Sequence, residues 1–187
     1  MLFKEKLEFR EAFCELDKDI FFLYNCRIKE DEKKMMNDFI KEAHKIIHAN
    51  CQALSVPVPN VRIAEPSDFS TPTIKSAVSK DGKELLINRT FAESKTSELF
   101  LWMVLSHECR HVWQATNGRE MFEHYKQSNG LSVFEYNAQP AEVDAWGWAV
   151  AVMSKIFGIR PTLEENFGAE LWNRIDKRAR EICSEDL

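Results

Sequence analysis

The stretch LSHECRHVWQ, residues 105–114, lies within an apolar run from about Ser97 to Thr116 and decides how the rest of the chain is interpreted. The run places hydrophobic residues on nearly every side of a helix, which is typical of a helix buried in the middle of a domain. Its two histidines, His107 and His111, are four residues apart, so they lie one above the other on one helix face. Both imidazoles can then reach a single metal ion.

Glu108 directly follows the first histidine and is offset from it by about 100° around the helix. From there its carboxylate can address a water molecule bound to the same metal. Zinc lowers the pKa of bound water to roughly 7, so a neighbouring carboxylate can accept the proton at neutral pH. The segment therefore predicts a Zn²⁺ site that produces a hydroxide nucleophile, with Glu108 as the general base.

A second pair of histidines, His44 and His48, has the same spacing on an earlier predicted helix. Lys45 stands there in place of the glutamate, and both side chains flank the apolar stripe beside many lysines. This pair is expected to lie at the surface and to bind no metal.

A catalytic zinc usually has three protein ligands and one open position, so a third ligand is expected elsewhere in the chain. The candidates are Glu142, Asp144 and His124. On a helix predicted from Pro140 to about Phe157, Glu142 heads the inward apolar stripe and Asp144 points about 200° away. Glu142 is the preferred ligand and His124 the alternative. A glutamate that only stabilises the positive end of the helix dipole would occupy the same position.

The segments before the histidine helix predict a helix and a small sheet. Residues 30–54 have helical periodicity with one apolar stripe. Residues 61–64 read as a short strand, and Asp81-Gly82 between two β-prone runs at residues 74–88 favours a tight hairpin. We therefore expect a small antiparallel sheet packed on the buried helix.

The remaining segments are assigned from their polar residues, glycines and helix-capping residues. Residues 117–137 are polar and predict a long loop that covers a site. Gly158 suits the end of the following helix, and Thr162 with Glu165 has the spacing of a capping box for a last helix. Residues 1–28 predict a helix or an extended arm packed on the body.

Length and composition are those of one globular domain. The chain has 187 residues, of which 44% are hydrophobic and 29% charged. We predict a single α+β domain with a helical N-terminal region at residues 1–54, a catalytic core at residues 55–157 and a C-terminal helix at residues 158–187.

Net charge argues against two classes of partner, and cysteine usage indicates the cellular compartment. The formal net charge of −5 gives no general attraction for nucleic acid or for an anionic membrane surface. No run reaches the roughly 18 apolar residues of a membrane span, and the start of the chain is too charged for a secretory signal. The odd number of scattered cysteines indicates reduced thiols and a cytoplasmic protein. These residues are Cys14, Cys26, Cys51, Cys109 and Cys183.

Other side chains have weaker assignments. Tyr125, Tyr136 and His124 are candidates to stabilise the oxyanion of a tetrahedral intermediate, although each suits loop packing equally well. Cys109 lies on the opposite side of its helix from the histidines and is expected to be a buried small hydrophobe. Four tryptophans are expected in the core rather than in a substrate platform: Trp102, Trp113, Trp146 and Trp148.

The motifs at residues 105–114 and YNAQPAEVDAWGWA at residues 136–149, with the hairpin before them, resemble the small HExxH zincins of gluzincin type. The ImmA/IrrE-like and other minimal bacterial or phage metallopeptidases look most similar, and the resemblance covers about residues 55–157. It implies a zincin fold whose edge strand binds an extended peptide. It also implies a zinc metallopeptidase with ligands His107, His111 and Glu142.

The chain departs from this pattern in one place, because Trp146 stands where a carboxylate is expected four residues after the third ligand. Asp144 cannot simply take over that role. A SprT-like pattern would make His124 the ligand, but the glycine that usually follows is Tyr125. A deformylase-like pattern lacks its upstream cysteine motif. The alternatives in function are a zincin-like binding or regulatory domain that cleaves nothing, and a metal-free helical domain.

Overall fold

The computed structural model describes residues 33–122, 125–126 and 130–185. The chain divides into two compact units, residues 1–39 and residues 40–187. In the first unit the described residues, 33–39, are helical. The prediction made for residues 1–28 lies outside the described residues. All elements below belong to the second unit.

The second unit opens with a helix at residues 40–53, as its hydrophobic periodicity predicts. Its apolar stripe, which includes Ile46, Ile47 and Cys51, is fully buried. His44 and His48 are exposed, as expected for the histidine pair without a glutamate.

Three short strands follow, β1 (Asn60–Ala64), β2 (Ser76–Val78) and β3 (Glu84–Asn88), in the order β1-β3-β2. The predicted strand and hairpin are confirmed. The prediction of an antiparallel sheet is wrong, because β1 pairs with β3 in parallel while β2 pairs with it antiparallel. Turn chemistry specifies the hairpin locally, whereas the direction of β1 depends on the longer connection that carries the chain across to β2.

That connection contains a short 3-10 helix, η1 (Pro66–Asp68), and is tied back to the sheet by Asn88. The amide of Asn88 donates to Pro72 O at 3.1 Å and to Ile74 O at 2.7 Å. The same side chain caps the short helix α2 (Arg89–Ala92) by accepting from Thr90 N. The segment that leads into β2 is therefore held in place by the end of β3.

The hairpin turn rests directly on the helix of the HECRH motif, α3 (Glu98–Asn117). Gly82 has a φ of +71°, and a Cβ added there would lie 3.0 Å from Ala115 Cβ and 3.2 Å from Val112 O. A larger residue would meet both the backbone strain and this contact. The glycine therefore lets the sheet approach α3 closely.

Helix α3 starts at the N-cap Ser97, whose side chain accepts from Phe100 N. The first turn is partly open, with Leu99 39% exposed, whereas every residue from Val104 to Arg110 is buried. The prediction of a buried central helix is confirmed, with charged and imidazole groups inside it.

The polar segment after α3 contains more structure than the predicted loop. It forms a 3-10 helix, η2 (Arg119–Phe122), and a short helix, α4 (Val133–Asn137). Ser132 and Glu135 form a capping box at the start of α4. This spacing was present in the sequence, and the number of polar residues and glycines around it concealed the signal.

Helix α5 (Pro140–Phe157) has the predicted bounds, with Pro140 in its first turn and Gly158 in the left-handed conformation at its end. The predicted capping box at Thr162 is wrong, because α6 (Glu164–Phe167) begins after Leu163 without a side-chain cap. Gly168, with φ +78°, then separates α6 from α7 (Ala169–Ser184). A single glycine in this backbone conformation splits the predicted last helix in two.

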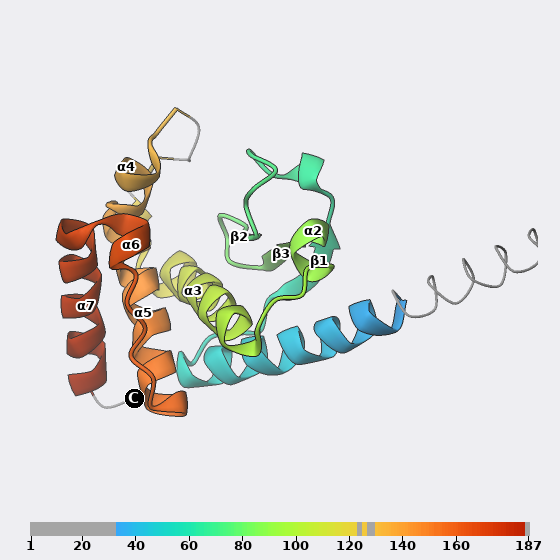
Figure 1. Ribbon diagram of the computed structural model, residues 1–187, viewed down its shortest axis with the longest axis horizontal. Helices are drawn as coiled ribbons and strands as arrows, with labels where there is room; N and C mark the ends of the chain where they lie inside the picture. The colour runs from blue at the N-terminus through green and yellow to red at the C-terminus, as the bar shows by residue number, and fades with distance from the viewer. Residues whose placement is uncertain (1–32, 123–124, 127–129, 186–187) are drawn as a thin grey trace, which may run out of the picture. The chain divides into compact units, whose positions relative to one another are not determined.

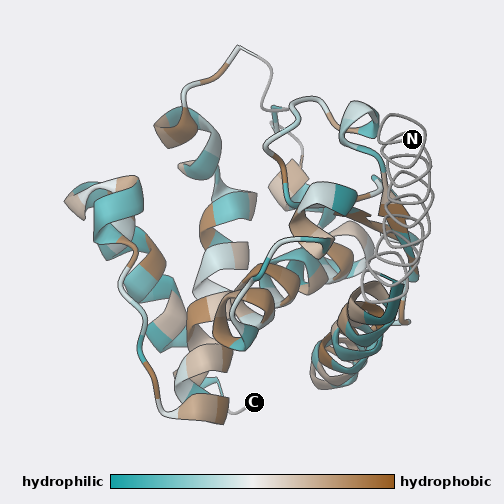
Figure 2. Ribbon diagram, turned by 45° about the vertical axis from the view of Figure 1, so that its right-hand side comes forward, coloured by the Kyte–Doolittle hydropathy of each residue, from teal (hydrophilic) through white to brown (hydrophobic). Residues whose placement is uncertain are grey.

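Helix α5 lies between α3 and α7 (Figure 1). Figure 2 shows hydrophobic segments of α3 and α5 where these two helices meet. Ala145 and Ala149 are completely buried, which agrees with the prediction that small residues bring α5 close to α3. On the other side a Cβ at Gly147 would lie 2.7 Å from Arg178 Cγ, so α7 also packs closely. The second unit is thus an α+β body with a mixed three-stranded sheet.

Two further sequence-based expectations concern cysteines and membrane helices. Cys51, Cys109 and Cys183 are free thiols, and the first two are buried. Cys109 contributes to the core side of α3, as predicted. Within the described part of the chain, no helix has the length and apolar character needed to cross a membrane.

Candidate metal centre

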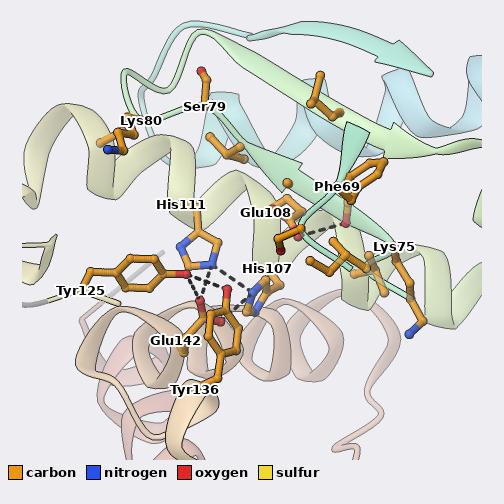
Figure 3. Close-up of a pocket in the computed structure, with 18 of the residues that line it drawn as sticks. Phe69, Lys75, Ser79, Lys80, His107, Glu108, His111, Tyr125, Tyr136 and Glu142 are labelled. Carbon is orange, nitrogen blue, oxygen red and sulfur yellow. Dashed lines mark hydrogen bonds and ion pairs between the residues drawn. The ribbon is translucent and has the colours of Figure 1, made fainter. Parts of the chain in front are cut away.

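His107, His111 and Glu142 converge at the point where α3 crosses the start of α5 (Figure 3). The two Nε2 atoms lie 3.0 Å apart. Glu142 Oε2 is 3.3 Å from His107 Nε2, and Glu142 Oε1 is 3.5 Å from His111 Nε2. The structure therefore brings together the three residues that were predicted as ligands from two separate helices.

These separations fit one small metal ion. A tetrahedral zinc with bonds of about 2.0–2.1 Å to nitrogen and oxygen has its ligand atoms about 3.3–3.4 Å apart. The distance between the two Nε2 atoms, and the distance from each of them to one of the two Glu142 oxygens, lie around that value. Two imidazole nitrogens and one carboxylate, with a side open to a cleft, are also a donor set that zinc accepts. Among the described residues, no other group of three such side chains has its ligand atoms this close.

The Glu142 carboxylate and the two histidines attract one another electrostatically even without a metal. Burial by itself lowers the pKa of His111, but the charge and hydrogen bond of Glu142 outweigh it and raise that pKa to about 9. Burial raises the pKa of Glu142, and the two histidines more than reverse this and hold it well below the usual range. Glu142 is only 1% exposed, so its carboxylate depends on a positive partner, which a divalent cation also provides.

A polar chain behind His111 fixes which ring nitrogen faces the site. Gln114 Nε2 donates to Ala141 O at 2.9 Å and to Asp144 Oδ2 at 2.8 Å. Because both amide hydrogens are used, Gln114 Oε1 must accept from His111 Nδ1, which lies 2.7 Å away. With Nδ1 used as the donor to Gln114, Nε2 is the nitrogen that would lose its proton to bind a metal.

Asp144 is the far end of this chain and not a ligand. Its carboxylate accepts two hydrogen bonds from Arg110, at 2.7 and 3.1 Å, and one from Arg178 of α7 at 2.8 Å. Asp144 is 3% exposed, so the expectation that it points away from the packed side of α5 is wrong. The helix is enclosed on more than one side, and Asp144 supports His111 through Gln114.

His107 is supported differently. Its ring lies against Trp146, with ring centroids 4.2 Å apart, and its Nδ1 has no hydrogen-bond partner among the described residues. Trp146 lines the cleft, so the prediction that it belongs to the core is wrong. Trp148, two residues further along α5, is in the core as predicted.

Glu108 faces the cleft beside the three converging residues and does not belong to their group. Its Oε1 accepts a hydrogen bond of 2.9 Å from Ser76 Oγ on β2. Ser76 carried no signal in the sequence, because only the folded sheet brings it next to α3. Glu108 therefore borders the candidate metal site, and its orientation is restrained from the sheet.

Two tyrosines lie on the other side of Glu142 (Figure 3). Tyr125 donates to Glu142 Oε1 at 2.7 Å, and its hydroxyl is 2.6 Å from that of Tyr136. Burial, followed by the charge of Glu142, raises the pKa of both phenols far above the usual range. Both are therefore hydrogen-bond donors at neutral pH. His124, the alternative ligand, lies outside the described residues.

The three converging residues, Glu108 and the two tyrosines open into one cleft of about 1410 Å³ between the sheet and the helices. Its floor is α3, and one wall is β2, which is an edge strand of the sheet. Apolar side chains on either side of the site contribute to the lining: Phe69, Ile74, Phe100, Val104 and Phe122. Lys75 and Lys80 project from opposite ends of the strand segment (Figure 3).

Comparison of the chain with protein-family models, with curated proteins and with solved structures yields no match in any of the three.

Proposed function

We propose that this protein is a zinc-dependent metallopeptidase with a zincin-like fold of gluzincin type. The observation that carries the proposal is the convergence of His107, His111 and Glu142 at the base of a cleft, where the two Nε2 atoms lie 3.0 Å apart and each lies 3.3–3.5 Å from one of the two Glu142 carboxylate oxygens. Glu108, adjacent in sequence to one of the two histidines and oriented into the same cleft, supports a hydrolytic role over a purely structural metal site.

The chemistry follows from where the chain holds its acids and bases. Zinc in this site supplies Lewis acidity, which makes a bound water more acidic and polarises a carbonyl group. Glu108 accepts the proton of the attacking water and can return it to the leaving amine. Ser76 keeps the Glu108 carboxylate in one orientation. Tyr125 and Tyr136 are neutral donors beside the site, suited to an oxyanion.

Two features support a peptide as the substrate. The cleft volume of about 1410 Å³ is larger than that of common small-molecule pockets, which measure about 300–1000 Å³. Strand β2 lines this cleft and, among the strands that the structure describes, pairs with β3 alone, so an extended chain can add to its other edge.

The test is reconstitution with zinc followed by incubation with a library of mixed peptides, with cleavage read by mass spectrometry. We expect about one zinc per chain and cleavage that chelator abolishes and zinc restores. Zinc-loaded protein that retains peptides without cutting any would support the alternative of a non-catalytic binding domain. Protein that takes up no zinc would overturn the proposal.

The proposal includes a cellular location and a class of partner. Three free cysteines in the described residues suit a reducing compartment, and we propose the cytoplasm. The net charge of −5 gives no reason to expect nucleic acid or membrane as a partner.

A further inference from the structure

We propose that Trp146 is a positioning residue for His107, restraining the imidazole by an aromatic contact instead of a hydrogen bond. The inference rests on the proposed metal site. A histidine that binds a metal almost always donates its second ring nitrogen to a carboxylate, a carbonyl or a water. In this protein the two histidines differ in how that requirement is met.

His111 follows the usual arrangement, because Gln114 accepts from its Nδ1 at 2.7 Å. His107 does not, since its buried Nδ1 has no partner among the described residues. The nearest ring is Trp146, at a centroid distance of 4.2 Å and an interplanar angle of 46°. His107 is therefore restrained by contact with an aromatic surface.

Trp146 can act in this way only if its own ring is fixed, and it is held from two sides. Its Nε1 donates to Asn137 Oδ1 at 2.9 Å. Phe167 of α6 packs on it with ring centroids 5.3 Å apart. The indole is thus anchored by α4 and α6, independently of His107, and presents a fixed surface to the ligand ring.

The place of Trp146 on α5 also favours a positioning role. Trp146 lies four residues after Glu142, so on α5 it stands one turn beyond the third ligand and on the same face. From that position it faces His107 on α3. The residue therefore ties the orientation of one ligand to the helix that supplies another.

The test compares substitutions at Trp146 with matched changes at Trp148. Both indoles belong to α5 and both donate to an asparagine at 2.9 Å, Trp146 to Asn137 and Trp148 to Asn50. Trp146 contacts His107, whereas Trp148 is a core residue. The readouts are the affinity for Zn²⁺ and the visible spectrum of the Co²⁺-substituted protein, which reports ligand geometry.

We expect Trp146→Leu to weaken metal binding on the order of tenfold or more and to change the Co²⁺ spectrum, because His107 loses its support. Trp146→Phe, which keeps an aromatic face, should recover most of the affinity. Trp148→Phe should lower the melting temperature and leave the spectrum unchanged.

Two results would overturn the inference, and they are distinguishable. If the parent protein binds Zn²⁺ and Co²⁺ while Trp146→Leu binds both with unchanged affinity and spectrum, the positioning role is wrong and the metal site stands. If the parent binds neither ion, the proposed function fails together with the inference. Should Trp146→Leu not fold, Asn137→Ala decides, because it removes the hydrogen bond that fixes the indole: a metal affinity and a spectrum identical to those of the parent would also overturn the role.

Discussion

Ser76 Oγ donates a hydrogen bond of 2.9 Å to the carboxylate of Glu108, joining the edge strand of the sheet to the helix of the two histidines. The two residues are far apart in the sequence and neither belongs to the group of metal-ligand candidates. The bond restricts the rotation of the carboxylate. It also means that the wall of the cleft that would bind substrate is in contact with the proposed base.

Replacement of the base should separate binding from turnover. Glu108→Gln is expected to retain zinc and the fold while peptide cleavage falls by a factor on the order of a hundred or more, because general-base catalysis contributes about 10²–10⁴. Ser76→Ala should cause a smaller loss, since it removes only the restraint. Zinc content and initial cleavage rates measure both. Equal rates for Glu108→Gln and the parent would show that Glu108 is not the base.

Zinc binding should depend on the three converging residues and on no other histidine pair. His107→Ala, His111→Ala and Glu142→Ala are each expected to lose most of the zinc, because two remaining ligands leave an incomplete site. His44→Ala and His48→Ala are the matched controls.

The control pair has the same spacing on the exposed side of an amphipathic helix, so its variants should keep the full zinc content. Elemental analysis after dialysis measures the difference. Retention of zinc by Glu142→Ala, combined with its loss in His124→Ala, would transfer the third ligand to His124 and favour the SprT-like alternative.

Gln114 should affect the metal without touching it. Gln114→Leu removes the acceptor for His111 Nδ1, and such partners typically change metal affinity by about 10–100-fold. Competition with a coloured chelator measures the affinity. Gln52→Leu, an exposed glutamine on the first helix of the second unit, should bind zinc like the parent. Equal affinity in both variants would remove Gln114 from the support of the site.

Asp144→Ala should lower the free energy of unfolding as well as the affinity for zinc. Arg110 loses its buried partner, and removing one member of a buried pair costs about 3–5 kcal/mol. Asp176 is the matched control, since it also binds two arginines, Arg160 and Arg180, whose side chains are 48% and 69% exposed. Asp176 is itself only 9% exposed, but both arginines remain in contact with solvent when it is removed, so the loss of stability should be smaller than at Asp144.

Urea unfolding with and without zinc distinguishes the two aspartates. Asp176→Ala should bind zinc normally and lose little stability, while Asp144→Ala should lose stability in the metal-free protein and bind zinc more weakly through Gln114. An unchanged unfolding midpoint for Asp144→Ala would contradict the network as described.

The hairpin turn offers a test of how the sheet is seated. Gly82→Ala and Gly158→Ala both place a side chain at positive φ, at +71° and +63°. Only at Gly82 does the added Cβ meet other atoms, whereas nothing lies within 4 Å at Gly158. We expect Gly158→Ala to cost about 1 kcal/mol and Gly82→Ala clearly more. Thermal unfolding decides, and equal losses would mean that the contact with Ala115 is unimportant.

Local periodicity predicted the parts of the site that depend on one helix at a time. The spacing of His107 and His111 needs only the helical period, and the inward direction of Glu142 follows from the stripe on α5. Hairpin and helix ends were predicted where glycine, proline or a capping residue marks them. The break at Gly168 had the same kind of signal and was missed because the capping-box spacing at Thr162 competed with it.

Relationships between distant elements could not be predicted. The parallel pairing of β1 with β3 depends on the path of the connection, and the contact of Ser76 with Glu108 depends on that sheet packing on α3. Gln114 and Asp144 are polar residues of a kind that usually faces solvent, so only the packing of α5 and α7 shows that they are buried.

Through the hydrogen bond from Arg178 to Asp144, helix α7 helps to support the candidate metal centre. None of the residues of this helix lines the cleft. Arg178 is linked through Asp144 and Gln114 to His111, so a change on the outer helix alters how firmly one imidazole is held. If the site holds zinc as proposed, the affinity for the metal can therefore evolve separately from the choice of substrate. Substitutions around Arg178 would adjust the first while every contact made by a peptide in the cleft stays the same.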